Sequence, residues 1–255
     1  MNLCPTYVIS FIKEKLPTYV LIENVPTLLK VKLLYKNQFM KVLDILQMEF
    51  GELYEIDGKV LDSSDFGVPQ TRLRAIIKMN KKGKIWEWPN KHDKKVTVRE
   101  AIGFLPSLES GEKSEIKWHF ARKHTKNNIL WMKHTPTGES AFSNEIFYPK
   151  KIDGTRIKGY ESSYRRISWD APAPTITIRN DCIASQRNVH PGRLMKDGTY
   201  SDARVLTPLE LMILNSLPTN WGIPDDTPEL LIRQCIGESI PPLLLKEIIG
   251  GIKNG

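Results

Sequence analysis

Residues 19–24 read Tyr-Val-Leu-Ile-Glu-Asn, an apolar run that changes abruptly to two polar side chains. Four consecutive apolar residues are typical of a strand that is buried in a parallel sheet. The segment before them, residues 7–15, has the spacing of an amphipathic helix that Pro17 would end. Ligands of open α/β sheets bind at the carboxyl ends of the strands, so Glu23 and Asn24 stand where a site is expected. For a bare dipeptide, a turn that caps the next helix is the more common explanation.

The following residues predict further elements of an α/β domain. Apolar residues recur at helical spacing over residues 39–50, and Gly51 is a suitable end for that helix. Residues 53–56 and 60–61 are expected to form two strands that are joined by a hairpin turn at Asp57-Gly58.

Residues 66–77, with the sequence FGVPQTRLRAII, place three polar side chains at alternate positions. On an extended strand Gln70, Arg72 and Arg74 would project from one face. Burying all three without partners is costly, and guanidinium groups suit phosphate or base-edge acceptors. The strip is therefore a candidate nucleic-acid contact; an edge strand with its polar face in water is the alternative.

The composition of the 255-residue chain, with 40% hydrophobic and 26% charged side chains, is typical of a protein that folds around a core. The sequence has no run of eighteen apolar residues and begins without the basic and apolar segments of a secretory signal, so we expect a cytoplasmic protein. Cys4, Cys182 and Cys235 are too scattered for a disulfide framework or a paired metal site, and no metal is expected.

The net charge of +8 is unevenly distributed along the chain. The basic excess is concentrated in residues 81–196, whereas residues 197–255 carry more acidic than basic side chains. This pattern suggests that a central module meets a polyanion. A solvated basic surface without a specific ligand is the alternative.

Several blocks of the sequence together resemble one enzyme family. Glu23-Asn24-Val25 and residues 66–74 are similar to the sixth and eighth motifs of the DNA cytosine-C5 methyltransferases. The remaining blocks follow in family order: residues 96–106 resemble the opening of the variable region, residues 164–177 and 189–191 the target-recognition region, residues 204–218 the ninth motif and residues 234–242 the tenth. The joint order is more specific than any single block.

The resemblance covers only the carboxy-terminal part of the family pattern. The family begins with a Phe-x-Gly-x-Gly loop for S-adenosylmethionine and a Pro-Cys-Gln nucleophile, but the 22 residues before Glu23 contain no glycine, and Cys4-Pro5 reverses the order. We therefore expect this chain to be the second subunit of a split bacterial restriction-modification methyltransferase. Its expected partners are double-stranded DNA and a complementary subunit that carries the glycine loop and the nucleophile. Without that subunit we expect it to be inactive.

The resemblance also implies roles for individual residues. Glu23 would hydrogen-bond N3 and the amine of a flipped cytosine, and Asn24 would fix the loop beneath the partner's cysteine. Arg72 and Arg74 would hold the cytosine carbonyl and its neighbours, with Gln70 positioning the strip. Glu238 and Ser239 would lie at the methyl-donor pocket, where the family usually has Asn in place of Glu238. In the ninth motif, the residues at positions 209 and 215 also depart from the family's frequent Arg and Gln.

The fold class implied is a partial doubly wound α/β methyltransferase domain with a smaller, β-rich target-recognition domain. The expected boundaries are residues 1–80 for the catalytic half, 81–196 for the recognition domain and 197–255 for a helical return that packs on the catalytic part. In this return, helices are expected to begin at Thr207-Pro208, after Pro228 and at Pro242, the last one running to Ile249. The recognition domain would begin at the Lys81–Lys84 turn, with Trp86 and Trp88 behind it. The candidates for DNA contact are Gln70, Thr175, Ile176, Thr177, Arg179, Asn180 and Arg187.

Two other functions remain open from the sequence. The chain could be a non-catalytic DNA-binding or regulatory module, or the remnant of a truncated methyltransferase. The retained Glu23, Gln70, Arg72 and Arg74 argue against decay, because a pure DNA-binding module has no use for a base-pocket carboxylate, which would repel phosphate. A nuclease is disfavoured because no Asp/Glu-x-Lys or His-Asn-His arrangement stands in a suitable context.

Overall fold

The computed structural model describes residues 4–253, which form two compact units. Unit 1 contains residues 4–62, 73–91 and 246–253, and unit 2 contains residues 63–72 and 92–245. The predicted boundaries at residues 80 and 196 are therefore not those of the compact units. Residues 81–91 pack in unit 1, whereas most of the expected helical return packs in unit 2. The functional labels given to the three segments stay a prediction.

Unit 1 is built on a three-stranded sheet with the order β1-β5-β4. The strands are β1 (Tyr19–Asn24), β4 (Tyr54–Asp62) and β5 (Leu73–Lys81), and both outer strands run antiparallel to β5. The prediction that the first strand lies in a parallel sheet is wrong for the described residues. β1 is an edge strand here, because β5 is the only strand among residues 4–253 that pairs with it.

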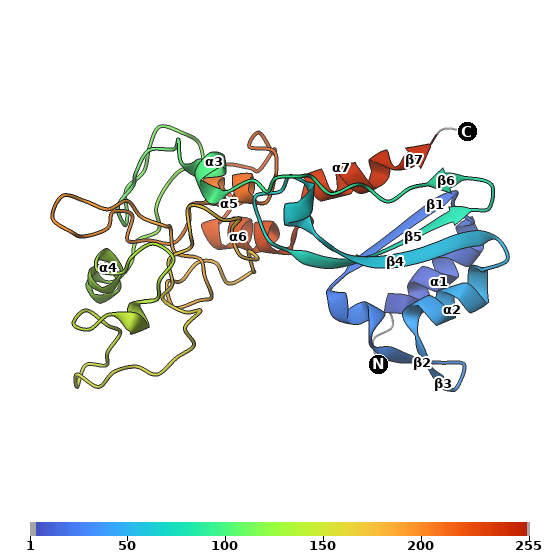
Figure 1. The fold of residues 1–255 in the computed structure, drawn as a ribbon, viewed down its shortest axis with the longest axis horizontal. Coiled ribbons are helices and arrows are strands. Elements are labelled where there is room, and N and C mark those ends of the chain that lie inside the picture. The colour runs from blue at the N-terminus through green and yellow to red at the C-terminus, as the bar shows by residue number, and fades with distance from the viewer. Residues whose placement is uncertain (1–3, 254–255) are drawn as a thin grey trace. The chain divides into compact units, whose positions relative to one another are not determined.

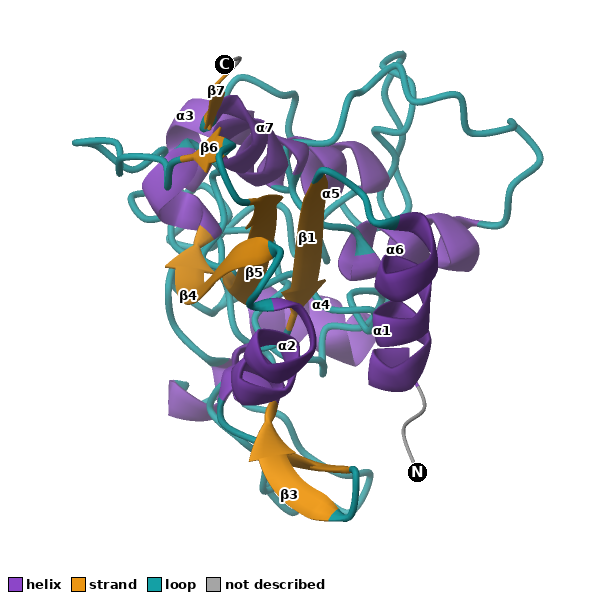
Figure 2. Ribbon diagram, turned by 90° about the vertical axis from the view of Figure 1, so that its right-hand side faces the viewer, coloured by secondary structure: helices purple, strands orange, loops and turns teal. Residues whose placement is uncertain are grey.

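Helices α1 (Cys4–Lys15) and α2 (Val42–Phe50) pack on one face of this sheet (Figure 2). Their shared core contains Ile12, Ile45 and Phe50 from the helices and Ile77 and Met79 from β5. The other elements of unit 1 are η1 (Pro26–Leu29), β2 (Lys32–Tyr35), β3 (Gln38–Lys41), β6 (Ile85–Trp86) and β7 (Ile252–Lys253). The last helix, α7 (Pro242–Gly250), begins as predicted at Pro242.

Two local predictions in unit 1 are wrong. Residues 39–41 continue a β-hairpin, and the helix starts only at Val42, because Leu33 and Met40 of the paired strands also pack on the unit 1 core. Asp57 and Gly58 form no turn. They lie in the middle of the nine-residue strand β4 and pair with β5, so the long ladder overrides the local turn preference of Asp-Gly.

The segment with two tryptophans also lies elsewhere than predicted. The Trp86 ring is buried in unit 1, and its Nε1 donates to the carbonyl oxygen of Ile248 at 2.7 Å. Trp88 Nε1 donates to Asp57 Oδ2 at 2.6 Å. These contacts hold residues 85–88 to the scaffold instead of making them the start of the recognition domain.

Unit 2 is mostly irregular chain with short helices (Figure 1). Its elements are η2 (Ser63–Phe66), α3 (Val98–Ile102), α4 (Lys126–Lys133), η3 (Ala141–Ser143), α5 (Pro208–Leu214) and α6 (Glu229–Glu238). The starts of α5 after Thr207 and of α6 after Pro228 are confirmed. Strand pairing within residues 92–245 is limited to isolated bridges, so this region is less β-rich than predicted.

A buried charged network supports the loops of unit 2. The Arg204 guanidinium is fully buried and donates to both carboxylate oxygens of Glu210, at 2.8 and 3.0 Å, and to Asp202 at 2.8 Å. Burial alone would raise the pKa of Glu210, but Arg204 holds that pKa well below its usual value. Glu210 also closes the capping box of α5 with Thr207, so one ionised carboxylate joins the helix start to the loop before it.

Candidate functional site

The end of β1 places an acidic and a basic side chain together in unit 1. Glu23 Oε1 lies 2.7 Å from Arg74 Nε, with the two side chains 17% and 14% exposed. The antiparallel register, which sets Asn24 opposite Ala75, brings them side by side. The pair fixes the direction of the Glu23 carboxylate while leaving part of it accessible. A carboxylate held in this way can accept a hydrogen bond from a polar heterocycle, and its protonated form can donate one.

Asn24 follows Glu23 at the exposed end of the strand. Its Oδ1 accepts a hydrogen bond from the backbone N–H of Val25 at 2.8 Å. The side chain therefore shapes its own turn, and the 3-10 helix η1 begins directly afterwards at Pro26. Of the four predicted catalytic residues, Glu23, Asn24 and Arg74 lie in unit 1, and Arg72 lies in unit 2.

Gln70 and Arg72 are buried in unit 2 and do not form an exposed strip, because β5 begins only at Leu73. Gln70 Nε2 donates to Asn215 Oδ1 at 2.7 Å, and Gln70 Oε1 accepts from the N–H of Ile176 at 2.9 Å. Arg72 donates to the carbonyl oxygens of Ile176, at 2.8 Å, and Gly237, at 3.0 Å. Both side chains thus hold the segment around residue 176 in place.

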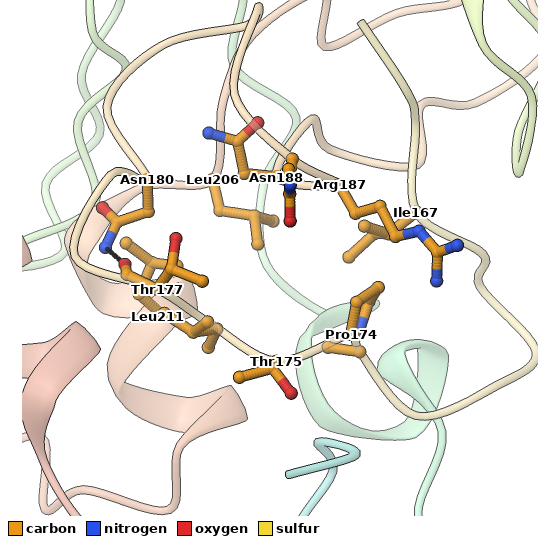
Figure 3. A pocket seen from close by; sticks show the side chains of 12 residues that line it. Ile167, Pro174, Thr175, Thr177, Asn180, Arg187, Asn188, Leu206 and Leu211 are labelled. Carbon is orange, nitrogen blue, oxygen red and sulfur yellow. Dashed lines mark hydrogen bonds between the residues drawn. The ribbon is translucent and has the colours of Figure 1, made fainter. Parts of the chain in front are cut away.

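Several of the predicted recognition residues line a narrow hollow of unit 2 (Figure 3). Thr175, Thr177 and Arg187 line it with exposed side chains, whereas Ile176 is buried in the main core of the unit. Thr175 Oγ1 donates to the carbonyl oxygen of Thr71 at 2.7 Å. Arg179 is also exposed and lies 3.7 Å from the carboxylate of Asp181.

Arg187 has a left-handed backbone conformation with φ +44°. Its N–H donates to the carbonyl oxygen of Ser162 at 2.7 Å, which holds the turn in this conformation. Non-glycine residues in this region cost about 1 kcal/mol or more, and such strain clusters at functional sites. The long basic side chain is therefore held at the rim of the hollow at an energetic cost.

Three residues have contacts or positions in unit 2 that the sequence did not predict. Asn215 links Gln70 to the hydroxyl of Ser239 and donates to the carbonyl oxygen of Ile236 at 3.1 Å. Gln186 lines the hollow next to Arg187 with an exposed amide. Asn180, a predicted base contact, is 1% exposed and donates to the carbonyl oxygen of Arg233 at 3.0 Å. The departure from the usual residue at position 215 was the signal that could have pointed to Asn215.

The two predicted cofactor residues differ in their surroundings. Ser239 Oγ donates to the carbonyl oxygen of Ile236 at 2.7 Å and accepts from Asn215, so its hydroxyl is used within unit 2. Glu238 is exposed at the end of α6, and among the described residues it forms no ion pair. Its carboxylate is the one group of the two that is free to meet a ligand.

Residues 4–253 contain no cluster of three His, Cys, Asp or Glu side chains arranged for a metal ion. In the same part of the chain, no helix has the length and apolarity required to cross a bilayer.

Comparison with known proteins fits the motif order. The profile of the family described as C-5 cytosine-specific DNA methylase matches residues 5–254. The chain belongs to this family. The family match confirms the resemblance found in the motifs, and it covers both units.

Relatives within the methylase family are of the type II class. The chain is 61% identical over 248 residues to the type II methyltransferase M1.HgaI of Avibacterium volantium, covering 97% of this chain and 69% of that protein. It is 28% identical to the type II methyltransferase M1.HphI of Haemophilus parahaemolyticus, covering 94% of this chain and 58% of that protein. The chain thus spans only part of both relatives.

Solved structures confirm the α/β methyltransferase fold. A DNA modification methyltransferase encoded within an E. coli prophage superimposes with a TM-score of 0.67 at 20% identity, over 98% of this chain and 74% of that one. The Dnmt2 methyltransferase of S. pombe gives a TM-score of 0.54 at 13% identity, over 96% and 70%. At these identities the likeness concerns the fold alone.

Proposed function

We propose that this chain is the base-pocket and target-recognition subunit of a split DNA cytosine-C5 methyltransferase of a restriction-modification system. A complementary subunit would supply the loop that binds S-adenosylmethionine and the nucleophilic cysteine. The observation that carries the proposal is the Glu23–Arg74 pair at the end of β1, within a chain of the methylase family.

In this proposal, Glu23 acts on the target base. Attack of a thiolate at C6 of cytosine increases electron density at N3, so a group that hydrogen-bonds or protonates N3 stabilises the transition state. The ion pair with Arg74 holds the Glu23 carboxylate in one direction and keeps the guanidinium beside it for the base carbonyl. The base must leave the stacked duplex to reach these groups.

Gln70 and Arg72 act as positioning residues in this proposal. Their hydrogen bonds fix the backbone of Ile176, which lies between the two exposed threonines at positions 175 and 177. Direct recognition of bases falls to the exposed side chains of Thr175, Thr177, Arg179 and Arg187. Threonine hydroxyls and arginine forks are suited to hydrogen bonds with base edges.

S-adenosylmethionine would supply the methyl group when bound. Of the two residues predicted for its site, Glu238 offers an exposed carboxylate that suits an ammonium group, and Ser239 shapes the backbone nearby through Asn215. The remainder of this site would come from the complementary subunit.

The edge of β1 supports the expectation of a partner. Its outer side carries no strand among residues 4–253, and an open hollow runs along it between β1 and α1. The lining includes Tyr7 and Phe11, which are 68% and 59% exposed, as well as Leu21. Unpaired backbone groups beside apolar side chains favour addition of a further strand.

A complementation assay tests the proposal. This chain is mixed with the portion of the Avibacterium protein that lies outside the matched 69%, and transfer of labelled methyl groups to duplex DNA is measured. We expect transfer only from the mixture, and its loss with Glu23→Gln. If the mixture transfers no methyl groups but still binds DNA, a non-catalytic module is favoured. Methyl transfer by this chain alone would contradict the split arrangement.

A further inference from the structure

The β2–β3 hairpin presents a basic and apolar outer face that has no role in the proposed chemistry. The register pairs Lys32 with Lys41 and Leu34 with Phe39. Side chains alternate between the faces of a strand, so these four residues share one face of the hairpin. Leu34 and Phe39 are 53% and 69% exposed, and both lysines are exposed.

The opposite face fixes the hairpin to unit 1. Leu33, Tyr35 and Met40 pack against the core of this unit. At the turn, Lys36 forms a 2.6 Å ion pair with Glu49 of α2, which also pairs with Lys13. These lysines and a hydrogen bond from Tyr35 lower the pKa of Glu49 to about 2, so the carboxylate remains charged at neutral pH. These contacts fix the hairpin to unit 1 and leave its outer face exposed to solvent.

The charge of the outer face is not balanced within the described chain. Lys36 and Lys13 share Glu49, but Lys32, Lys41 and the neighbouring Lys30 form no ion pair among residues 4–253. Like charges placed directly opposite each other on two strands are destabilising. The arrangement therefore costs stability in the free protein, and an anionic ligand would remove that cost.

The hairpin also lies at the functional end of the sheet. β1 ends at Asn24, and only η1 separates it from β2. Figure 2 shows the hairpin extending beyond the end of the sheet at which β1 stops. The start of β1 is opposite the end of β5, so the turn that holds Lys82 and Lys84 lies at the other end of the same sheet.

We infer that the outer face of the β2–β3 hairpin binds the phosphate backbone of DNA, with Lys32 and Lys41 contacting phosphates beside the base pocket. This inference rests on the proposed function for the identity of the polyanion. Lysine ammonium groups bind phosphates without regard to sequence, so the hairpin would position the duplex and would not select the target. The exposed Leu34 and Phe39, which lie nearer the hairpin turn than the lysine pair, would cover the sugar edge next to those phosphates.

Salt-dependent binding of a fluorescent DNA duplex by the full chain tests this inference. In Lys32→Gln/Lys41→Gln, two phosphate contacts are removed, so the slope of log K against log salt concentration should fall by about 2. The control Lys246→Gln/Lys253→Gln removes the same charge from exposed positions of unit 1 that lie outside both the hairpin and the basic segment 81–196, and it should leave the slope nearly unchanged. Equal changes in both variants would show a general charge effect and would overturn the inference.

Two further readouts separate this inference from its alternatives. The hairpin variant should unfold at the same temperature as the wild type or higher, because it loses a like-charge pair; a lower midpoint would indicate a structural role for the lysines. If DNA binding is unchanged but assembly with the complementary subunit is lost, the face docks an acidic protein surface and the inference is wrong. The complementation assay could fail while the hairpin variant still lowers the salt slope more than the control variant does. That result would count against the split enzyme and not against DNA binding by the hairpin.

Discussion

Glu23 Oε1 lies 2.7 Å from Arg74 Nε, across neighbouring antiparallel strands and with both side chains largely shielded from solvent. The two residues are 51 positions apart in the sequence, and the register of β1 on β5 decides their contact. This ion pair orients the carboxylate that is proposed to meet the base.

Replacing Arg74 tests this orienting role. Arg74→Lys keeps the charge but loses the planar fork, so we expect methyl transfer by the complemented enzyme to fall by about tenfold to a hundredfold. Glu23→Gln should cost more, because it removes the group proposed to act at N3. Single-turnover rates measure both effects, and an Arg74→Lys rate equal to the wild type would contradict the orienting role.

Gln70→Leu should destabilise unit 2 by about 2 kcal/mol or more. It leaves the N–H of Ile176 and the side-chain oxygen Oδ1 of Asn215 without their buried partner. Denaturant unfolding measures the loss, with the exposed Thr177→Ala as the control that should change stability little. If Gln70 instead faced DNA, the substitution would weaken binding and leave unfolding unchanged.

Arg187→Gly is expected to affect stability and recognition in opposite directions. Glycine relieves the left-handed conformation at φ +44°, so the protein should be as stable as the wild type or more stable by up to about 1 kcal/mol. Discrimination between duplexes that differ at the target site should decrease, because the side chain is lost. A large loss of stability would show that the Arg187 side chain is structural.

The stability of unit 2 should decrease between pH 6.5 and pH 4. Burial lowers the pKa of His124 to about 4, and its Nε2 accepts a hydrogen bond from the N–H of Val205. The unfolded pKa is about 6.5, so the unfolded chain binds more protons in this range. The contribution of His124 is fully present above pH about 6.5 and is lost as the pH falls through the folded value.

His124→Gln keeps an acceptor for Val205 but cannot titrate. Thermal melts from pH 7 to pH 4 should therefore show a smaller decrease in midpoint for this variant than for the wild type. Buried His190 has its pKa lowered in the same direction by burial and the nearby arginines, so some pH dependence should remain. Identical pH profiles for both proteins would show that His124 is not a source of the effect.

The sequence by itself determined the family and the elements with strong local signals. The family that the motifs indicated was confirmed by the family match over residues 5–254. The capped start of α5 at Thr207-Pro208, the start of α6 after Pro228 and the start of α7 at Pro242 were also predicted correctly. These features depend on residues close together in the chain, where capping and proline geometry act directly.

Only the tertiary structure decided which polar residues face solvent and which are buried. Gln70, Arg72 and Arg74 alternate in sequence, yet two of them are buried in unit 2 and the third pairs with Glu23 in unit 1. Asp57-Gly58 has the local signal of a turn but lies in a strand because β5 pairs along its whole length. Such outcomes depend on partners far away in the sequence, since a buried polar group must find whichever donor or acceptor the fold brings to it.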